Sequence, residues 1–516
     1  MNAAEGLVRT LVGAGIEVCF TNPGTSEMHF VAALDRVAGM RSILGLFEGV
    51  VSGAADGYGR MAERPAATLL HLGPGLANGI ANFHNAKKAR TPIVSLVGNH
   101  ALSHLRFDAP LSADVEAIAR SVSAWVRSAR DPAELPSDGA AAVAAALAPP
   151  GGIATLVVPA DVAWGEAEGP APELPVRKRE TVATDSVRDA ARALRSGEPA
   201  VVLMTGAALR ERPLAAAGRI ARATGARLFC NTFNARLSRG AGRVAVPTLP
   251  YFAEAASEAL RGVLHLVLVG AGPPVAFFAY PGRPSALTPE GCSVHALASP
   301  AQDAEAALEA LQDELGARSA PPELAELRRP DAPHGALTAG AIGASLAALL
   351  PEGAIVVDEA ITGSPALQGP TATAAPHDWL FLTGGAIGQG LPVATGAAVA
   401  CPGRKVVCLE GDGSAMYTLQ SLWTQAREGL DVTTVILANR SYAILQVELA
   451  RMGFRDPGPR ARDMLGIARP ALDFVRLAEG MGVRARRATS AEDLHRELAT
   501  ALALPGPRLI EAVIQG

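Results

Sequence analysis

Residues 405–445, KVVCLEGDGSAMYTLQSLWTQAREGLDVTTVILANRSYAIL, contain the pattern that decides the fold. An apolar run that ends at Glu410 is predicted to form a strand, and GDGS (411–414) turns from it into a helix. After 25 further residues, a second apolar run ends at Asn439. Two parallel strands joined by a helix have their carboxyl ends at the same edge of the sheet. Asp412 and Asn439 are therefore expected to face the same crevice.

Three features of this edge favour a phosphorylated ligand together with a metal ion. The glycines on both sides of Asp412 allow the backbone to approach a ligand closely. The helix that begins near Ser414 can receive an anion at its N-terminus. A carboxylate, an amide oxygen and a free carbonyl suit Mg²⁺ when phosphate oxygens and water complete its octahedron. The simpler alternative is that Asp412 only caps the helix and Asn439 lies in a turn.

The rest of the chain alternates short apolar runs with Ala-rich amphipathic stretches, which is typical of βαβ units. Its 516 residues suggest about three domains. We predict an α/β protein with three doubly wound parallel-sheet domains at 1–164, 184–318 and 335–516, joined by linkers at 165–183 and 319–334. The predicted strands are 16–21, 41–47, 67–71, 93–97 and 153–158, then 200–204, 228–230 and 264–269, then 354–357, 406–409, 432–438 and 508–513.

Composition excludes several classes of protein. Hydrophobic residues make up 49% and charged residues 19%, so the chain can bury sizeable cores. A net charge of −4 and only 4% aromatic residues argue against a nucleic-acid partner. Five scattered cysteines without a CxxC motif indicate a reducing compartment. The long uncharged runs, such as 379–403, are interrupted by glycine, proline and polar residues and lack the continuous apolar character of a membrane span, so we expect a cytoplasmic protein without a membrane partner.

Two glycine-rich stretches resemble the dinucleotide fingerprint. LHLGPGLANG (70–79) follows a predicted strand, but no acidic residue stands about 20 positions later. GGAIGQGLP (384–392) has the order G-x-x-G-x-G, which inverts the fingerprint. A nicotinamide-dependent dehydrogenase is therefore only a remote alternative, and tight strand-to-helix turns explain the first stretch as well.

The complete GDG-N pattern resembles the signature of thiamine-diphosphate enzymes. In that family the aspartate, the asparagine and a main-chain oxygen two residues later hold Mg²⁺ on the diphosphate, which implies Asp412, Asn439 and Ser441 here. The family also has a glutamate that hydrogen-bonds the aminopyrimidine ring and so helps the thiazolium C2 to lose its proton. LGLFEGVVSGAADGYGRM places Glu48 at that position, between a predicted strand and a helix.

Within this family the motifs are most similar to those of benzoylformate decarboxylases. TNPGTSE (21–27) matches their first loop, and His71 follows Glu48 at the spacing of their pocket histidine, as a candidate proton donor or carboxylate anchor. GGAIGQGLP and DEAITGS (358–364) match segments that support the bent cofactor and contact its diphosphate. The resemblance implies cofactor contacts from Glu48, Ala360, Thr362, Gly385, Ile387, Gly411, Asp412, Gly413, Ser414, Asn439, Ser441, Tyr442, Ala443 and Ile444. It implies a substrate pocket formed by Thr25, His71, Phe277, Phe278, Leu445 and Glu448.

The sequence also departs from both of the subgroups that it resembles. GAGPPVAFFAYPG (270–282) offers Phe277 and Phe278 but lacks the second histidine of benzoylformate decarboxylases. Glu448 stands near the position of their pocket aromatic residue, either as a solvated surface residue or as a charge that disfavours anionic 2-oxo acids. DEAITGS lacks the histidine of acetolactate synthases. An aryl-specific pocket is therefore not implied.

The resemblance implies an enzyme that depends on thiamine diphosphate and Mg²⁺ and decarboxylates a 2-oxo acid. The resulting enamine would be released as an aldehyde or added to a carbonyl acceptor. The domains at 1–164 and 335–516 would bind the aminopyrimidine and the diphosphate, from different chains, in a homodimer at least and in an expected homotetramer. The alternatives are an acetolactate-synthase-type carboligase, for which FAD in the middle domain stays open, and a non-catalytic paralogue that binds the cofactor.

Overall fold

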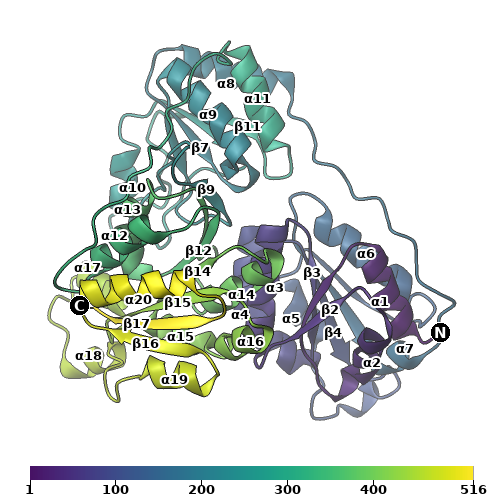
Figure 1. Cartoon of the computed structure of the whole chain (residues 1–516). Coiled ribbons are helices and arrows are strands. Elements are labelled where there is room, and N and C mark those ends of the chain that lie inside the picture. The colour runs from purple at the N-terminus through teal and green to yellow at the C-terminus, as the bar shows by residue number, and fades with distance from the viewer. Residues whose placement is uncertain (515–516) are drawn as a thin grey trace. The chain divides into compact units, whose positions relative to one another are not determined.

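The computed structural model describes residues 1–514 and divides the chain into two compact units. The first unit comprises Met1–Arg177, Arg329–Thr371 and Leu382–Gly516, and the second comprises Lys178–Arg328 and Ala372–Phe381. In the described part of the chain, helices alternate with strands of three predominantly parallel sheets (Figure 1). This arrangement confirms the predicted α/β class.

The first sheet has the strand order β2-β1-β3-β4-β6-β5, and all its pairs are parallel. Its strands are β1 (Val18–Asn22), β2 (Arg41–Leu44), β3 (Ala66–Leu70), β4 (Ile93–Asn99), β5 (Trp125–Ser128) and β6 (Ile153–Pro159). Its helices are α1 (Ala3–Gly13), α2 (Met28–Arg36), α3 (Glu48–Ala62), α4 (Leu72–Ala89), α5 (Val115–Arg120), α6 (Leu135–Leu147) and α7 (Ala160–Trp164). Helices α1, α2 and α6 cover one face, and α3, α4 and α5 cover the other (Figure 1).

The second unit contains a parallel sheet of order β11-β10-β7-β8. Its strands are β7 (Ala200–Met204), β8 (Arg227–Cys230), β10 (His265–Val269) and β11 (Ser293–Ala298), and β9 (Leu237–Arg239) pairs antiparallel with β13 (His377–Phe381). Its helices are α8 (Thr184–Arg195), α9 (Glu211–Thr224), α10 (Ala253–Ala259) and α11 (Ala304–Glu314). Alternate residues of β7 and β10, such as Val201, Leu203, Leu266 and Leu268, form its core.

The third sheet runs β16-β17-β15-β14-β12 within the first unit. Its strands are β12 (Ala354–Glu359), β14 (Val406–Gly411), β15 (Val432–Ala438), β16 (Arg484–Ala488) and β17 (Arg508–Val513). Helices α12 (Ala339–Leu349), α13 (Ser364–Thr371) and α20 (Ala491–Ala503) cover one face. Helices α14 (Gly390–Ala400), α16 (Ser421–Glu428) and α19 (Phe474–Gly480) cover the other, and α15 (Asp412–Thr418), α17 (Ala443–Arg451) and α18 (Pro459–Leu465) lie in its connections.

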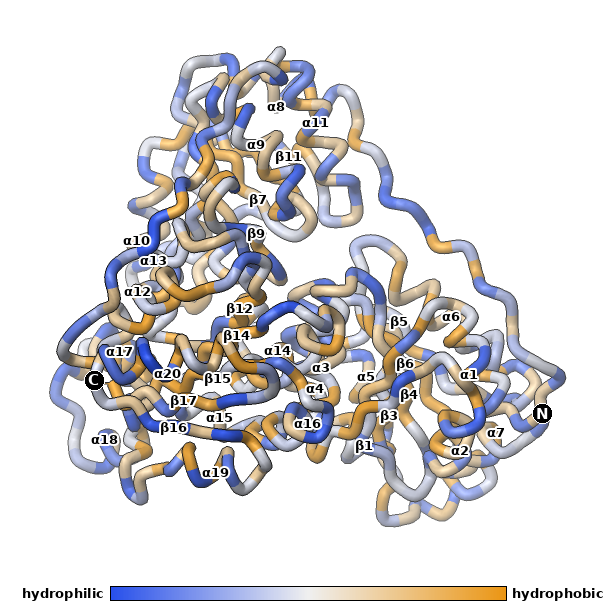
Figure 2. Tube along the Cα trace, viewed as in Figure 1, coloured by the Kyte–Doolittle hydropathy of each residue, from blue (hydrophilic) through white to orange (hydrophobic). Residues whose placement is uncertain are grey.

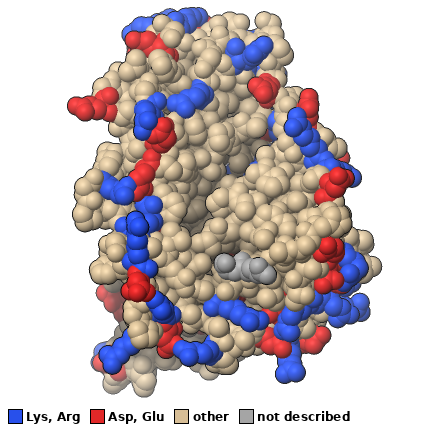
Figure 3. Space-filling view, turned by 90° about the vertical axis from the view of Figure 1, so that its left-hand side faces the viewer, with Lys and Arg blue, Asp and Glu red and all other residues tan. Residues whose placement is uncertain are grey.

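The strands supply the buried apolar layers, since hydrophobic residues are concentrated along them in Figure 2. On the face shown in Figure 3, basic and acidic side chains are interspersed, and no single-sign stripe of the kind that binds nucleic acid is visible there. Across residues 1–514, no helix combines the length and the apolar character that a membrane span requires. All five cysteines are free.

Helices α3 and α14 join the two sheets of the first unit through closely packed glycines. A Cβ added at Gly57 would lie 2.1 Å from the carbonyl oxygen of Val393, and one added at Gly396 would lie 1.8 Å from that of Ala54. Only hydrogen fits at both positions, so the two helix backbones come into direct contact. This contact places the N-terminal end of α3 beside the loop that precedes α14.

Candidate functional site

The sequence pattern around Asp412 forms the compact arrangement that we predicted. Strands β14 and β15 are parallel neighbours, β14 ends at Gly411, and Asp412 begins α15. The Asp412 carboxylate accepts the backbone N–H of Gly413 (2.9 Å) and that of Arg440 (2.5 Å). Asn439 accepts the N–H of Ser441 through Oδ1 (2.9 Å). Asp412 and the Asn439 turn are therefore adjacent at the carboxyl ends of two strands.

Burial raises the pKa of the Asp412 carboxyl, and the backbone N–H donors oppose this shift. Asp412 is 4% exposed, so its charge is only partly compensated by these donors. A cation bound beside it would supply the missing compensation. This environment fits a metal ligand better than an exposed helix cap.

The residues present fit a magnesium ion whose ligands come partly from the protein and partly from a phosphorylated cofactor. Over residues 1–514, no group of three or more His, Cys, Asp or Glu side chains could hold a metal ion. The available donors are the Asp412 carboxylate, the Asn439 amide oxygen and the main-chain oxygen of Ser441, which are all oxygen ligands. Mg²⁺ is commonly held by one or two carboxylates, with substrate phosphates and water completing the shell. Gly413 is needed here, because a Cβ would lie 2.4 Å from the Tyr442 ring.

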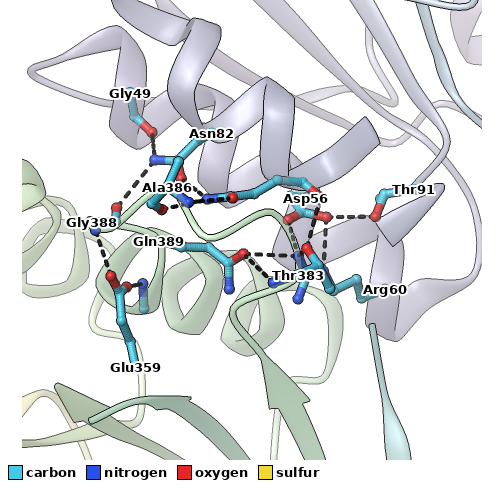
Figure 4. A network of polar contacts seen from close by, with 12 residues as sticks. Gly49, Asp56, Arg60, Asn82, Thr91, Glu359, Thr383, Ala386, Gly388 and Gln389 are labelled. Carbon is cyan, nitrogen blue, oxygen red and sulfur yellow. Dashed lines mark hydrogen bonds and ion pairs between the residues drawn. The ribbon is translucent and has the colours of Figure 1, made fainter. Parts of the chain in front are cut away.

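Two buried carboxyl groups lie beneath the loop 383–390. Glu359 on β12 accepts the backbone N–H groups of Gly388 (2.6 Å) and Gly390 (Figure 4). Its register partner on β14 is Glu410, and both residues are almost fully buried. Burial raises the pKa of Glu359 to about 7, and burial together with the Glu359 charge raises the pKa of Glu410 well above its ordinary value. Two adjacent buried carboxyls cannot both ionise, so the pair keeps a proton at neutral pH.

Glu48 and His71 meet in the N-terminal part of the first unit. Glu48 is the first residue of α3, and its Oε2 accepts the Asn78 amide (3.0 Å). His71 immediately precedes α4. A Cβ added at Gly75 would lie 3.3 Å from Glu48 Oε1 and 3.4 Å from His71 Cβ. The two predicted catalytic residues thus both lie beside Gly75 and approach its Cα hydrogen.

Glu27 fixes the orientation of the His71 ring. The Nδ1 atom of His71 lies 2.8 Å from Glu27 Oε2, and Ser26 Oγ lies 3.2 Å from the same nitrogen. Glu27 is buried and also accepts the N–H of Gly24 (2.8 Å). A carboxylate can only accept a hydrogen bond, so Nδ1 carries the hydrogen and Nε2 is directed away from Glu27. Our sequence reasoning did not select Glu27, because only the folded chain brings it to His71.

Family models match both ends of the chain. The N-terminal TPP binding domain of thiamine pyrophosphate enzymes matches residues 1–118, and the C-terminal TPP binding domain matches residues 366–512. A Mycobacterium tuberculosis protein named "Putative acetolactate synthase large subunit IlvX" is 55% identical over 515 residues, which cover 100% of this chain and 99% of that protein. The chain belongs to the thiamine pyrophosphate enzymes.

The more distant relatives in this family include proteins named as decarboxylases as well as acetolactate synthases. A benzoylformate decarboxylase of Pseudomonas aeruginosa is 29% identical over 97% of this chain and 96% of its own length. The thiamine diphosphate-dependent 4-hydroxybenzoylformate decarboxylase of Rhodococcus jostii RHA1 superposes with a TM-score of 0.86 at 26% identity, covering 100% of this chain and 99% of that one. The predicted family and three-sheet fold are therefore confirmed, and so is its assignment to an enzyme family.

The other predicted cofactor residues of this thiamine pyrophosphate enzyme lie on three segments of the first unit. Ala360 and Thr362 follow β12, where Asp358 accepts the Ala360 N–H (3.1 Å). Gly385 is exposed and has a φ of +77°, and Ile387 is half-buried in the same loop. The third segment follows Asn439 and contains Ser441, Tyr442, Ala443 and Ile444, which lead into α17. All three segments come from connections at the carboxyl ends of strands, as we expected.

The predicted substrate-pocket residues are distributed over both units. Leu445 is 47% exposed on α17, and the Glu448 carboxylate lies 3.8 Å from Arg451 Nε, so a cation accompanies this half-buried charge. Thr25 is exposed beside Ser26 in the loop that holds His71. In the second unit, Phe277 packs against Phe233 and Tyr251, and Phe278 is 57% exposed. Their shared role in a pocket stays a prediction.

A cavity of about 490 Å³ lies elsewhere in the C-terminal sheet. It is lined by the first residues of β16 and β17, including Arg484, Arg486 and Arg508. These residues lie at the amino ends of their strands, whereas Asp412 and Asn439 lie at the carboxyl ends of β14 and β15. The cavity is therefore separate from the cofactor residues.

Proposed function

We propose that this chain is an enzyme that uses thiamine diphosphate and Mg²⁺ to remove CO₂ from a 2-oxo acid. The observation that carries the proposal is the pairing of Asp412 with the Asn439 turn at the carboxyl ends of β14 and β15. Thiamine diphosphate, when bound, supplies a carbanion that adds to the ketone and accepts the electron pair released with CO₂. The other roles described below belong to side chains and backbone groups of this protein.

Asp412, Asn439 and the main-chain oxygen of Ser441 would hold the metal ion and, through it, the diphosphate. Gly411, Gly413 and Ser414 form the adjoining helix start, which offers backbone N–H groups to phosphate oxygens. Glu48 would hold and return a proton at the pyrimidine ring nitrogen. Its carboxylate lies in the first turn of α3, beside the positive end of the helix dipole.

His71 would transfer a proton at the carbon that loses CO₂, or would bind the carboxylate before it leaves. The Glu27 carboxylate fixes Nδ1–H, so Nε2 is the nitrogen available for either role. An aldehyde would then be released. The 29% identical benzoylformate decarboxylase and the superposable 4-hydroxybenzoylformate decarboxylase support this outcome.

A second candidate is a carboligase that joins the decarboxylated fragment to another carbonyl compound, as in the formation of 2-acetolactate from two pyruvates. The observation that favours it is the 55% identity over the whole chain to a protein named as an acetolactate synthase large subunit. Both candidates need the same residues up to the loss of CO₂. They differ in whether the decarboxylated fragment then takes up a proton or forms a bond to the carbonyl carbon of a second molecule.

Product analysis tests the proposal and separates these two candidates. The purified protein would be incubated with thiamine diphosphate, Mg²⁺ and a panel of 2-oxo acids that includes pyruvate, 2-oxobutyrate, 2-oxoglutarate and benzoylformate. CO₂ with an aldehyde would support decarboxylation, and CO₂ with an α-hydroxy ketone, such as 2-acetolactate, would support ligation. Cofactor binding without CO₂ from any acid would contradict both and would favour a non-catalytic paralogue.

We further propose a homodimer as the minimum assembly, with a homotetramer as the expected state and a cytoplasmic location. The assembly is supported by the family resemblance, because cofactor sites in that family lie between chains. The location is supported by the five free cysteines. Analytical ultracentrifugation gives the mass in solution. A monomer that binds the cofactor and releases CO₂ would overturn the shared-site arrangement.

A further inference from the structure

Three side chains of α4 bind carbonyl groups at alternate positions of the loop 383–390, and Figure 4 shows the hydrogen bond from Asn82 to Gly388. Their hydrogen bonds run from His84 Nε2 to the Gly384 carbonyl (3.1 Å), from Asn85 Nδ2 to the Ala386 carbonyl (2.7 Å) and from Asn82 Nδ2 to the Gly388 carbonyl (3.2 Å). Asn82 and Asn85 are almost fully buried. Water cannot readily replace such bonds, so α4 fixes the path of the loop.

The approach of α4 to the loop depends on a glycine and on further bonds to Asn85. A Cβ added at Gly384 would lie 2.4 Å from Asn85 Oδ1 and 2.9 Å from Asn85 Cα. The Ala386 N–H donates to Asn85 Oδ1 (3.2 Å), and Thr383 Oγ1 donates to the Asn85 carbonyl (2.7 Å). Asn85 therefore pairs with both the N–H and the carbonyl of Ala386, as a neighbouring strand would.

Asn82 also binds the start of α3. Its Nδ2 donates to the carbonyl of Gly49 (2.8 Å), the residue after Glu48, and its Oδ1 accepts from Asn85 Nδ2 (3.1 Å). One buried amide group thus joins the backbone beside Glu48 to the Gly388 carbonyl. A shift of either segment would break a bond that has no solvent substitute.

The opposite side of the loop is held by Glu359, which accepts the N–H groups of Gly388 and Gly390. Between the bound carbonyls lie Gly385 and Ile387, the two loop residues that we expect to touch the cofactor. A Cβ added at Gly385 would meet nothing within 4 Å, so the loop faces open space there. Hydrogen bonds from α4 on one side and to Glu359 on the other therefore fix residues 385–387, while Gly385 stays exposed.

We propose that Asn82, His84 and Asn85 of α4 preorganise the loop 383–390 to receive the aminopyrimidine ring, with Asn82 as a positioning residue that also joins the loop to the start of α3. The proposal rests on the proposed function of the same site. All these hydrogen bonds lie within one chain, so the loop is shaped before any ligand binds. Preorganisation raises affinity because less ordering remains to be done on binding.

The test compares the full-length wild type with Asn82→Ala and Asn85→Ala, with Lys88→Ala as the matched control on an exposed turn of α4. Hydrogen–deuterium exchange of peptides covering 383–390 is measured without cofactor. Affinity for thiamine diphosphate at saturating Mg²⁺ is measured by tryptophan fluorescence. We expect loop exchange about tenfold faster and affinity about tenfold weaker in both asparagine variants, because Asn82→Ala removes one side-chain hydrogen bond to the loop and Asn85→Ala removes two. Lys88→Ala should match the wild type.

A second pair keeps the test decisive if the buried variants do not fold. His84 is half-buried, so His84→Ala should fold, with faster loop exchange, whereas His84→Gln keeps an N–H donor and should restore most of the protection. A merely structural role would lower the melting temperature without this selective rescue. Unchanged loop exchange in every variant would overturn the proposal. A wild type that binds no thiamine diphosphate would instead overturn the proposed function, because exchange without cofactor still reports on the loop.

Discussion

Asp412 is the residue on which the proposed metal site depends, because it is the only charged ligand of the three. Asp412→Ala should weaken binding of thiamine diphosphate in the presence of Mg²⁺ by at least about 100-fold, since removing one partner of a buried charge pair costs about 3–5 kcal/mol. Fluorescence titration measures the affinity. Asp431→Ala removes a carboxylate that pairs with Lys405 at the amino end of β15 and serves as the control. Unchanged affinity in Asp412→Ala would refute the metal assignment.

Glu27 is a positioning residue for His71, and its substitution separates orientation from cofactor binding. Glu27→Gln keeps the size of the side chain, but its amide can donate to Nδ1 and so favour the wrong ring tautomer. We expect kcat for CO₂ release to fall by about 100-fold and the affinity for thiamine diphosphate to stay constant. Equal losses of affinity and kcat would mean that Glu27 only maintains the local fold.

At the scale of elements, the contact of α3 with α14 decides whether the first unit assembles. Gly396→Ala would force a methyl group against the Ala54 carbonyl, and overpacking of this kind costs about 1–3 kcal/mol. The melting temperature should fall by about 2–4 °C for each kcal/mol. Gly369→Ala places the same methyl group on α13, where nothing lies within 4 Å, and should not lower the melting temperature. Identical melting of both variants would contradict the packing argument.

The elements also show what the sequence could predict. The strands β14 and β15 and the turns that follow them carry local signals, because apolar runs end at glycine or asparagine. The edge strand β5 was missed, since its residues WVRS are half-buried or exposed and form no apolar run. The partnerships of Glu27 with His71 and of Glu359 with Glu410 were missed for another reason. They join residues that are distant in sequence, and a single glutamate does not indicate its partner.

At the scale of the whole molecule, the second unit has a built-in sensitivity to acid. His377 on β13 is fully buried, and its Nδ1 lies 2.7 Å from the Ala375 carbonyl. Burial first, and then the charge of Arg239, lower the pKa of this histidine to about 3. The unfolded chain takes up a proton near pH 6.5, whereas the folded chain does not until about pH 3. The stability that the neutral His377 contributes is therefore fully present above pH 6.5 and is lost as the pH falls toward 3.

His377→Asn tests this sensitivity, because the asparagine amide can replace Nδ1–H as a donor but cannot titrate in this range. Urea unfolding of the wild type should lose about 2–3 kcal/mol more than the variant between pH 7.5 and 4.5, which is about two pKa units of linkage. If the two proteins lose stability in parallel, His377 is not the acid-sensitive group.

The central claim is that this chain binds thiamine diphosphate and activates it through Glu48. Proton NMR of the cofactor's C2–H exchange in deuterated buffer, with Mg²⁺ and the full-length protein, measures this activation directly and needs no knowledge of the substrate. We predict exchange faster than that of free thiamine diphosphate by at least about 100-fold in the wild type, and a loss of that gain in Glu48→Gln, which still binds the cofactor but cannot transfer the proton. Wild-type exchange no faster than that of the free cofactor, or full exchange in Glu48→Gln, would contradict the account.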